Sequence, residues 1–596
     1  MHKFIYPVIL FTLLGKLSLA QVSEIDLKTV PFSRMGSYMC FSLLQDKDDK
    51  QPLIYLRDVS GNLLWQWNGV FRLEVLEIER PVAYEAKASG TVLTLSTSNG
   101  KVEVIFQDTN TVRFRGSGVG LKLTRTLFDA NSYLIPLPGL QWRIKMGSKA
   151  EYAFTRLKGE IVVSGPQWGV RSFEHRTEKP ETIVINLYPG NENNFEGVLE
   201  QYTSGWKIRD YKNTTFEEEL AKVNNELKNF YNTGAKTPQE YEETKKLAQY
   251  VNWSSIVAPR VNMTRHGMLM SKRNMRAVWS WDHCFNALAS RSNPKIAWEN
   301  YILPFDYQHE QGSLPDIMND NNVTWGFLKP PIHGWTLKKL MEKPGIVDEN
   351  KLKELYPKLA KWTEYWFKYM DDDKNGIPQY NHGNDSGWDN ATVFDLGFSV
   401  ESPDLCAFLI LQMEVLSELA QKLGKKEDEK MWMDRSQALF EELIRHFWNG
   451  DKFVSRKTFS GQINKKSQSL ISYIPLILGK RLPENYRSKM IKDLKTKGFL
   501  TANGLASESP QSPFYEADGY WRGPIWAPTT YIMVEALKEC GETALAREIA
   551  VKYCNMCKKS GFGENFNALT GEQLQDSGYT WTSSVFLLLL EEYVSK

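Results

Sequence analysis

The hydrophobic periodicity of the chain changes near residue 214, and this change divides the sequence into two regions of different secondary structure. Before it, short β-branched runs such as residues 102–106 and 112–115 are separated by turn residues, a pattern typical of an all-β sandwich. After it, segments such as residues 405–423 carry apolar residues at the i, i+3, i+4 and i+7 spacing of helices. The sequence therefore predicts a β-sandwich domain at residues 21–200 and an all-α domain at residues 241–596.

Residues 201–240 are predicted to link these two domains. Phe216, Leu220, Val223, Leu227 and Phe230 recur at helical spacing, which predicts an amphipathic helix in this segment. The fold class is therefore multidomain, with an N-terminal all-β region, a linker helix and a C-terminal helical region.

The first 20 residues have the features of a secretory signal peptide. Lys3 precedes an apolar run at residues 4–14, and Ser18 and Ala20 form a small-x-small exit before Gln21. The run is too short to cross a bilayer, and no later run reaches about 18 apolar residues. We therefore expect a secreted or periplasmic protein that has no membrane span.

Composition excludes some partners and favours another. Lys plus Arg number 73 and Asp plus Glu 71, so the overall charge gives no electrostatic reason to bind nucleic acid. The chain contains 19 Trp, 26 Tyr and 29 Phe. Aromatic rings suit the C–H faces of sugars, although core packing accounts for most of them. An oligosaccharide is the expected partner, and the oligomeric state is left open.

Four loops of the helical region combine aromatic residues with carboxylates, glycine and asparagine. They are residues 279–283 (WSWDH), 381–390 (NHGNDSGWDN), 519–526 (GYWRGPIW) and 561–571 (GFGENFNALTG). Glycosidic bond cleavage needs a carboxylic acid to protonate the leaving oxygen and, in inverting enzymes, a second carboxylate to activate water. Asp389 beside Trp388, and Glu564 between Phe562 and Phe566, fit because neighbouring rings raise the pKa of a carboxyl. Alone, the Asp would be a turn former and the Glu a surface residue, but four such loops favour a catalytic site.

In this order, the four segments resemble glycoside hydrolase family 63, the processing α-glucosidase family and its bacterial relatives. The matching patterns are W-x-W-D, S-G-x-D-N, Y-W-R-G-P-[IV]-W and E-N-[YF]-N-x-L-T-G, within residues 253–596. The resemblance implies an (α/α)6 toroid, with Asp389 as the general acid and Glu564 as the general base of an inverting reaction. Asp282, the aspartate of W-x-W-D, is implied to hold sugar hydroxyls. Ala391 and Thr392 replace the S-P that members often carry, which leaves the identity of the sugar open.

Aromatic and charged residues of these and neighbouring Gly/Pro-rich loops are the candidates for sugar binding. Arg522 could hold hydroxyls and orient Glu564, or it could form a structural salt bridge. The predicted substrate-binding residues are Trp281, Asp282, Trp325, Trp335, Trp388, Tyr520, Trp521, Arg522 and Trp526.

Residues 371–377 have the opening pattern of a calcium-binding loop. Oxygen-bearing side chains occupy positions 1, 3 and 5, Gly376 occupies position 6, and position 7 offers a backbone carbonyl. His382 stands at position 12, where a glutamate is usual, and similar loops of the family suggest a more distant acid. The implied ligands are Asp371, Asp373, Asn375, Ile377 and Glu401, and a plain acidic turn is the alternative. No cofactor is expected for the chemistry.

The main functional prediction is a secreted, inverting, exo-acting α-glucosidase that releases glucose from an oligosaccharide. The alternative is an (α/α)6 hydrolase of another α-linked sugar, such as an α-mannoside, a mannosylglycerate-like glycoside or trehalose. A non-catalytic carbohydrate-binding protein is disfavoured because both expected carboxylates are present. A polysaccharide lyase built on Tyr520 and His283 would leave Asp389 and Glu564 without a role.

Overall fold

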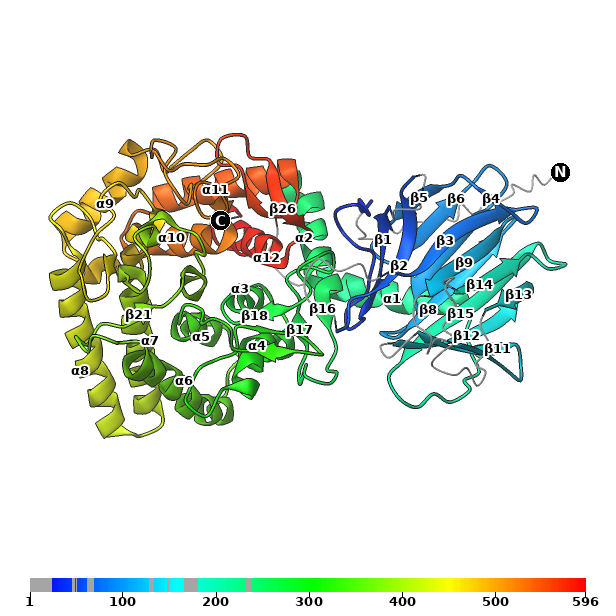
Figure 1. Cartoon of the computed structure of the whole chain (residues 1–596), viewed down its shortest axis with the longest axis horizontal. Coiled ribbons are helices and arrows are strands. Elements are labelled where there is room, and N and C mark those ends of the chain that lie inside the picture. The colour runs from blue at the N-terminus through cyan, green and yellow to red at the C-terminus, as the bar shows by residue number, and fades with distance from the viewer. Residues whose placement is uncertain are drawn as a thin grey trace, which may run out of the picture.

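The computed structural model describes residues 24–45, 49, 51–61, 69–127, 133–146, 150–165, 181–231 and 237–595. The predicted signal peptide at residues 1–20 lies outside these residues. Figure 1 shows a body of strands from the N-terminal region beside a larger body of helices. Within the described ranges, no helix is long and apolar enough to cross a membrane.

The N-terminal region forms two antiparallel sheets, which confirms the all-β prediction for it. The first has the strand order β1-β2-β3-β9-β14-β13, with β4 on β3, and the second has the order β10-β11-β12-β15-β8-β7-β6-β5. Buried residues of both sheets, such as Leu73 and Phe114, belong to one hydrophobic cluster. The strands are β1 (Met39–Leu44), β2 (Leu53–Asp58), β3 (Gly69–Glu77), β4 (Arg80–Val82), β5 (Glu85–Ala88), β6 (Leu93–Ser96), β7 (Lys101–Phe106), β8 (Thr111–Ser117), β9 (Gly120–Leu127), β10 (Tyr133–Leu137), β11 (Gln141–Met146), β12 (Ala150–Lys158), β13 (Glu160–Ser164), β14 (Glu181–Tyr188) and β15 (Asn194–Tyr202).

The amphipathic segment after the strands is helix α1 (Phe216–Tyr231). Its buried residues Phe216, Val223 and Leu227 recur at helical spacing, as the sequence predicts. The guanidinium of Arg115, on β8, lies 4.0 Å from the ring centroid of Phe216. The apolar face of α1 therefore packs on the sheets.

Helices dominate from residue 242 onward, as predicted. They are α2 (Glu242–Ser255), α3 (Asp282–Ala289), α4 (Pro294–Ile302), α5 (His333–Met341), α6 (Glu349–Tyr369), α7 (Pro403–Lys422), α8 (Lys426–Glu442), α9 (Glu484–Thr496), α10 (Ala527–Glu539), α11 (Thr543–Ser560) and α12 (Thr580–Leu589), with the 3-10 segment η6 (Leu470–Arg481) between α8 and α9. Contacts run from α3 to α5, α7, η6, α10 and α12, and α12 returns to α3. These elements therefore form a closed ring. The remaining helices, α2, α4, α6, α8, α9 and α11, each contact a member of it.

Short strands join the loops that connect these helices. β18 (Val278–Trp279) pairs with β19 (Ile317–Met318), which pairs with β20 (Val323–Thr324). β24 (Ile525–Trp526) pairs with β25 (Gly563–Phe566), and β25 pairs with β26 (Gln573–Ser577). The second of these sheets places the Y-W-R-G-P-I-W loop directly beside the E-N-F-N loop.

Candidate active site

Asp389 lies in a turn whose backbone is shaped by two glycines. A Cβ on Gly383 would stand 1.9 Å from the carbonyl oxygen of Asp389, so no other residue fits there without moving the turn. Gly387 has φ 71°, and a Cβ there would stand 2.6 Å from the Trp281 ring. Desolvation raises the pKa of Asp389 above its ordinary value, while the charge of Lys329 opposes the increase. A raised pKa is what a carboxylic acid needs in order to donate a proton.

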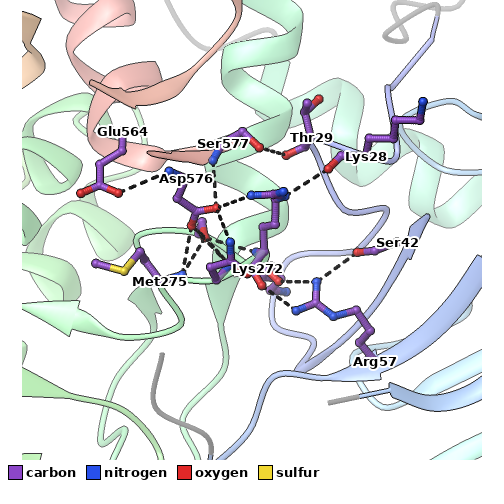
Figure 2. Close-up of polar contacts among 12 residues, drawn as sticks. Lys28, Thr29, Ser42, Arg57, Lys272, Met275, Glu564, Asp576 and Ser577 are labelled. Atoms are coloured by element: carbon purple, nitrogen blue, oxygen red, sulfur yellow. Dashed lines mark hydrogen bonds and ion pairs between the residues drawn. The ribbon is translucent and has the colours of Figure 1, made fainter. Parts of the chain in front are cut away.

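Glu564 lies on β25 and is 3% exposed. The hydroxyl of Tyr520 donates a hydrogen bond to its Oε1 atom at 3.0 Å. The backbone N–H of Asp576 donates to its Oε2 atom at 3.4 Å (Figure 2). Burial, followed by the negative charge of Asp576, raises the pKa of Glu564 from 4.5 to about 8. Both oxygens are thus held in place, but the charged form of the carboxyl is disfavoured.

Asp282 is the first residue of α3, directly after the W-x-W sequence. Burial raises its pKa to about 7, with Lys329 lowering it and Asp389 raising it. The charge of Asp282 in turn raises the pKa of Glu564. Asp282 is therefore close enough to interact electrostatically with both Asp389 and Glu564. The Oδ2 atom of Asp282 is buried without a hydrogen-bond partner among the described residues, so it is available to a sugar hydroxyl.

Lys329 is a site residue that the sequence analysis missed. Its Nζ atom lies 3.3 Å from Oδ1 of Asp316 and donates a hydrogen bond to the carbonyl of Asn384 at 2.8 Å. Its charge lowers the pKa of Asp282 and of Asp389. Nothing in the local sequence distinguishes this lysine from a surface lysine. Its role arises from the carboxyls that the fold gathers around it.

Most of the predicted sugar-binding tryptophans pack against one another. The rings of Trp521 and Trp526 stack with centroids 4.0 Å apart, and Trp388 lies 4.8 Å from Trp521. Trp281 is 6.4 Å from Trp521. All four side chains are buried, at 3% exposure or less. They form a tryptophan cluster that supports the site loops. Among the predicted aromatic residues, Tyr520 contacts Glu564.

Two other predicted substrate-binding residues, Trp335 and Trp325, are not among the four residues of the tryptophan cluster. Trp335 was predicted in a loop, but it lies in α5 and packs against Tyr531 at 5.9 Å. The loop prediction for Trp335 is wrong because α5 begins at His333, just after Pro331, in a segment whose prolines and glycine are typical of a loop. Trp325 is 44% exposed.

Arg522 forms the structural salt bridge that was the alternative to a role in orienting Glu564. Its guanidinium pairs with Asp395 and donates to the carbonyl of Asn390 at 3.0 Å. The contact with Glu564 that we expected of Arg522 comes from Tyr520 instead.

The predicted calcium loop and its distant acid come together. The Asn375 amide donates to Oε1 of Glu401 at 2.8 Å and to Oδ2 of Asp373 at 3.1 Å, and its backbone N–H donates to Oδ1 of Asp371 at 3.1 Å. Ile377 follows in the same turn, with its N–H bound to the Asn375 side-chain oxygen. Three carboxylates therefore accept hydrogen bonds from Asn375, and carboxylate oxygens are ligands that calcium prefers.

Among the described residues, one group of His, Cys, Asp and Glu side chains has ligand atoms close enough together to hold a metal ion, and it lies outside this loop. It consists of His283, Cys284 and His333, whose ligand atoms all lie within 4.8 Å of one another. Burial lowers the pKa of His283 to about 4 and raises that of the Cys284 thiol. These side chains are therefore neutral, with His283 and Cys284 on α3 and His333 at the start of α5.

The comparison with known protein families defines the class of protein as a glycoside hydrolase. The family model described as "Mannosylglycerate hydrolase MGH1-like glycoside hydrolase domain" matches residues 275–582. The chain belongs to this family, and the predicted resemblance to glycoside hydrolase family 63 is confirmed.

Relatives and solved structures agree with this assignment. The chain is 22% identical to a mannosylglycerate hydrolase of Thermus thermophilus over 393 residues, covering 52% of this chain and 93% of the relative. It is 20% identical to a glucosylglycerate hydrolase of Mycolicibacterium hassiacum over 410 residues, covering 52% and 91%. The relatives therefore support the mannosylglycerate-like alternative better than the main prediction of an α-glucosidase.

Two solved structures share the fold. A family 63 mannosylglycerate hydrolase of Thermus thermophilus, in complex with glucose, matches with a TM-score of 0.51 at 21% identity, covering 58% of this chain and 98% of that one. A bacterial glucoamylase complexed with acarbose matches with a TM-score of 0.57 at 11% identity, covering 96% and 95%. The second match extends over the N-terminal sheets as well as the helices.

Proposed function

We propose that this protein is an inverting hydrolase of a small α-linked glycoside of the mannosylglycerate or glucosylglycerate kind. The observation that carries the proposal is the meeting of Asp389, Glu564 and Asp282 in one desolvated site of a chain that belongs to this hydrolase family. The sugar and aglycone follow from the names of the relatives, which act on glycerate glycosides.

The helical region is, in this proposal, an (α/α)6 toroid. Its elements alternate along the chain between helices that contact the ring from outside and members of the ring itself, from α2 to α12. Such an arrangement brings the loops at one end of the inner helices to a common centre. It explains why carboxyls separated by 282 positions, at residues 282 and 564, act on each other.

Asp389 would protonate the leaving oxygen, because its desolvated carboxyl favours the protonated form. Glu564 would accept a proton from the attacking water on the opposite face of the sugar, held in place by Tyr520 and by the backbone of Asp576. The free Oδ2 atom of Asp282 would accept a hydroxyl of the sugar in the cleavage site.

A second candidate is the exo-acting α-glucosidase of an oligosaccharide. The likeness of nearly the whole chain to a glucoamylase fold, N-terminal sheets included, supports it. The signal-peptide pattern of residues 1–20 supports secretion or a periplasmic location for either function.

We test the function with mannosylglycerate, glucosylglycerate, trehalose, maltose and an α-mannobiose. The expected result is hydrolysis of a glycerate glycoside, and proton NMR of the first minutes should show the β-anomer of the sugar. Cleavage of maltose alone would replace the proposal with the α-glucosidase. Early release of the α-anomer would contradict inversion and the role of Glu564. Asp389→Asn should lower turnover by several orders of magnitude on the same substrate.

We also propose that Asp371, Asp373, Asn375, Ile377 and Glu401 hold a structural calcium ion. The convergence of carboxylates on Asn375 supports this. An ion bound only to the folded chain stabilises it by mass action, so excess chelator should lower the thermal midpoint by several degrees. The Asp373→Ala variant should start from the lower midpoint and not respond to chelator. No metal by elemental analysis, together with an unchanged melting curve, would contradict the proposal.

A further inference from the structure

A β-bulge lies opposite the proposed base. Gly563 pairs with Ser577 and Asn565 pairs with Leu574, so Glu564 alone faces both Gln575 and Asp576. Gln575 is the extra residue of the bulge. Its φ of 62° is a left-handed conformation that is unusual outside glycine. The bulge turns the Asp576 N–H to the side chain of Glu564, at 3.4 Å from Oε2.

The carboxylate of Asp576 is fully buried and fastened to one loop, residues 271–275 (Figure 2). Its Oδ2 accepts hydrogen bonds from the Ser271 hydroxyl at 2.5 Å and from the Met275 backbone at 3.1 Å. Asn274 contributes its backbone N–H at 3.3 Å to the same oxygen, and its side chain donates to Oδ1 at 3.2 Å. Arg273 completes the set through an ion pair at 3.2 Å. So many donors on one carboxylate fix the bulge to the loop.

The same loop is held by the N-terminal region, through Arg57 of β2 and the segment before β1. Lys272, 2% exposed, donates through Nζ to the Ser33 hydroxyl at 3.0 Å and to the carbonyl of Ser37. Arg57 of β2 donates to the carbonyls of Lys272 and Arg273. Arg273 also donates to the carbonyl of Lys28 at 3.1 Å. Because buried cations are tolerated only with such partners, these bonds hold the loop against the N-terminal region.

We propose that Asp576 is a positioning residue for Glu564, and that it connects the base to the N-terminal sheets through residues 271–275. The inference rests on the proposed function, in which Glu564 activates water. The base must keep hydrogen-bond distance from that water, and a displacement of about 1 Å can cost about 100-fold in rate. The sheets thereby become part of the apparatus that holds the base. In addition, the charge of Asp576 raises the pKa of Glu564.

The test uses Asp576→Asn in the full chain, with mannosylglycerate as the substrate. This variant keeps the backbone N–H but loses the charge and the acceptor for Arg273. We expect kcat to fall at least tenfold with KM within twofold, and the limb of the kcat/KM pH profile that Glu564 sets to move to lower pH. Infrared titration of the Glu564 carboxyl, assigned with Glu564→Gln, should show the same lower pKa without any substrate.

Two further variants separate positioning from general stability. Tyr38→Phe removes a hydrogen bond to the Ala258 carbonyl across the same interface without touching Asp576, and it should keep the kcat of the wild type. Arg273→Met should lower kcat in the wild-type background and have a smaller effect in the Asp576→Asn background, because the two side chains act through one contact.

Wild-type kcat and an unmoved Glu564 pKa in Asp576→Asn would overturn the inference, as would an equal loss of kcat in Tyr38→Phe. If Asp576→Asn does not fold, the same measurements are made on Arg273→Met. A wild-type kcat in Arg273→Met would then overturn the inference. Full activity of Glu564→Gln is a different outcome, because it removes Glu564 from the mechanism and with it the proposed function. An inactive Glu564→Gln beside a normal Asp576→Asn contradicts only the positioning role.

Discussion

At the scale of single residues, Glu564 combines two opposing requirements. Tyr520 and the Asp576 backbone hold its oxygens, which favours a defined direction for proton transfer. Burial and the nearby charge of Asp576 disfavour the ionised form that a base must have. Between the ordinary pKa of 4.5 and the folded pKa of about 8, the folded protein therefore favours the protonated carboxyl, whereas the carboxyl of the unfolded chain is ionised.

The pH dependence of kcat/KM should report this carboxyl. In Asp389→Asn with a glycosyl fluoride, whose leaving group needs no acid, kcat/KM depends on the ionised form of Glu564 alone, and its pKa of about 8 places the acid limb near pH 8. Below that pH, kcat/KM of this variant should fall about tenfold per unit. Initial rates at low substrate concentration between pH 5 and pH 10 measure the limb. A flat profile from pH 5 to pH 8 would contradict the assignment of the base.

Glu564→Gln should lose turnover by several orders of magnitude while gaining stability at alkaline pH. The folded pKa of about 8 lies above the unfolded value of about 4.5. Stability is therefore fully present below pH 4.5 and falls as pH rises toward 8, because only the unfolded chain ionises. Gln stays neutral throughout, so the midpoint of the variant relative to the wild type should increase over this range. Calorimetry at pH 4.5, 6 and 8 measures it, and a constant difference would argue against a raised pKa.

At the scale of elements, much of the molecule could be predicted and some of the site could not. The helix predicted at residues 405–423 appears as α7, Pro403–Lys422, because the apolar periodicity within one segment is enough to indicate a buried helix. Asp389 and Glu564 could be proposed from the sequence because each lies in a distinctive loop. Asp576 and Lys329 carry no local signal, since their roles come from partners such as residues 271–275 that are distant in sequence. Trp335 was wrongly predicted to lie in a loop, because the prolines directly before α5 are typical of a loop.

Gly387 offers a test of how closely the loops must fit. Gly387→Ala would place a Cβ 2.6 Å from the Trp281 ring, at φ 71°. Gly424→Ala is the matched control, since φ is also 71° there and no atom lies within 4 Å of the added carbon. Both should pay the left-handed backbone cost of about 1–2 kcal/mol, and Gly387→Ala should also lose kcat/KM at least tenfold. Equal activity of the two variants would show that the contact with Trp281 does not shape the site.

At the scale of the whole molecule, the sheets and the helical ring share one hydrophobic core. Buried apolar residues of both bodies belong to one hydrophobic cluster, and Lys272 and Arg57 add hydrogen bonds across the interface. Separate domains joined by a small polar surface usually move relative to each other. The continuous core of this chain favours a fixed arrangement instead.

Calorimetry tests the coupling of the two bodies. Because the hydrophobic cluster continues across them, heating should give a single cooperative transition. Far-UV and near-UV circular dichroism should then report the same midpoint. Two resolved transitions would show that the sheets and the ring unfold independently and would weaken the connection from the sheets to Glu564.

The contact that closes the ring, between α12 and α3, also has a consequence for biosynthesis. A growing polypeptide releases α3 from the ribosome long before α12, so the partner of α3 is absent while most of the ring is being made. During that interval the side of α3 that faces α12 lacks its native partner, although α4 and α5 can already pack against α3. Assembly of the catalytic centre is therefore a late event, and a ribosome that stalls before β25 and α12 have emerged would leave an inert and aggregation-prone intermediate.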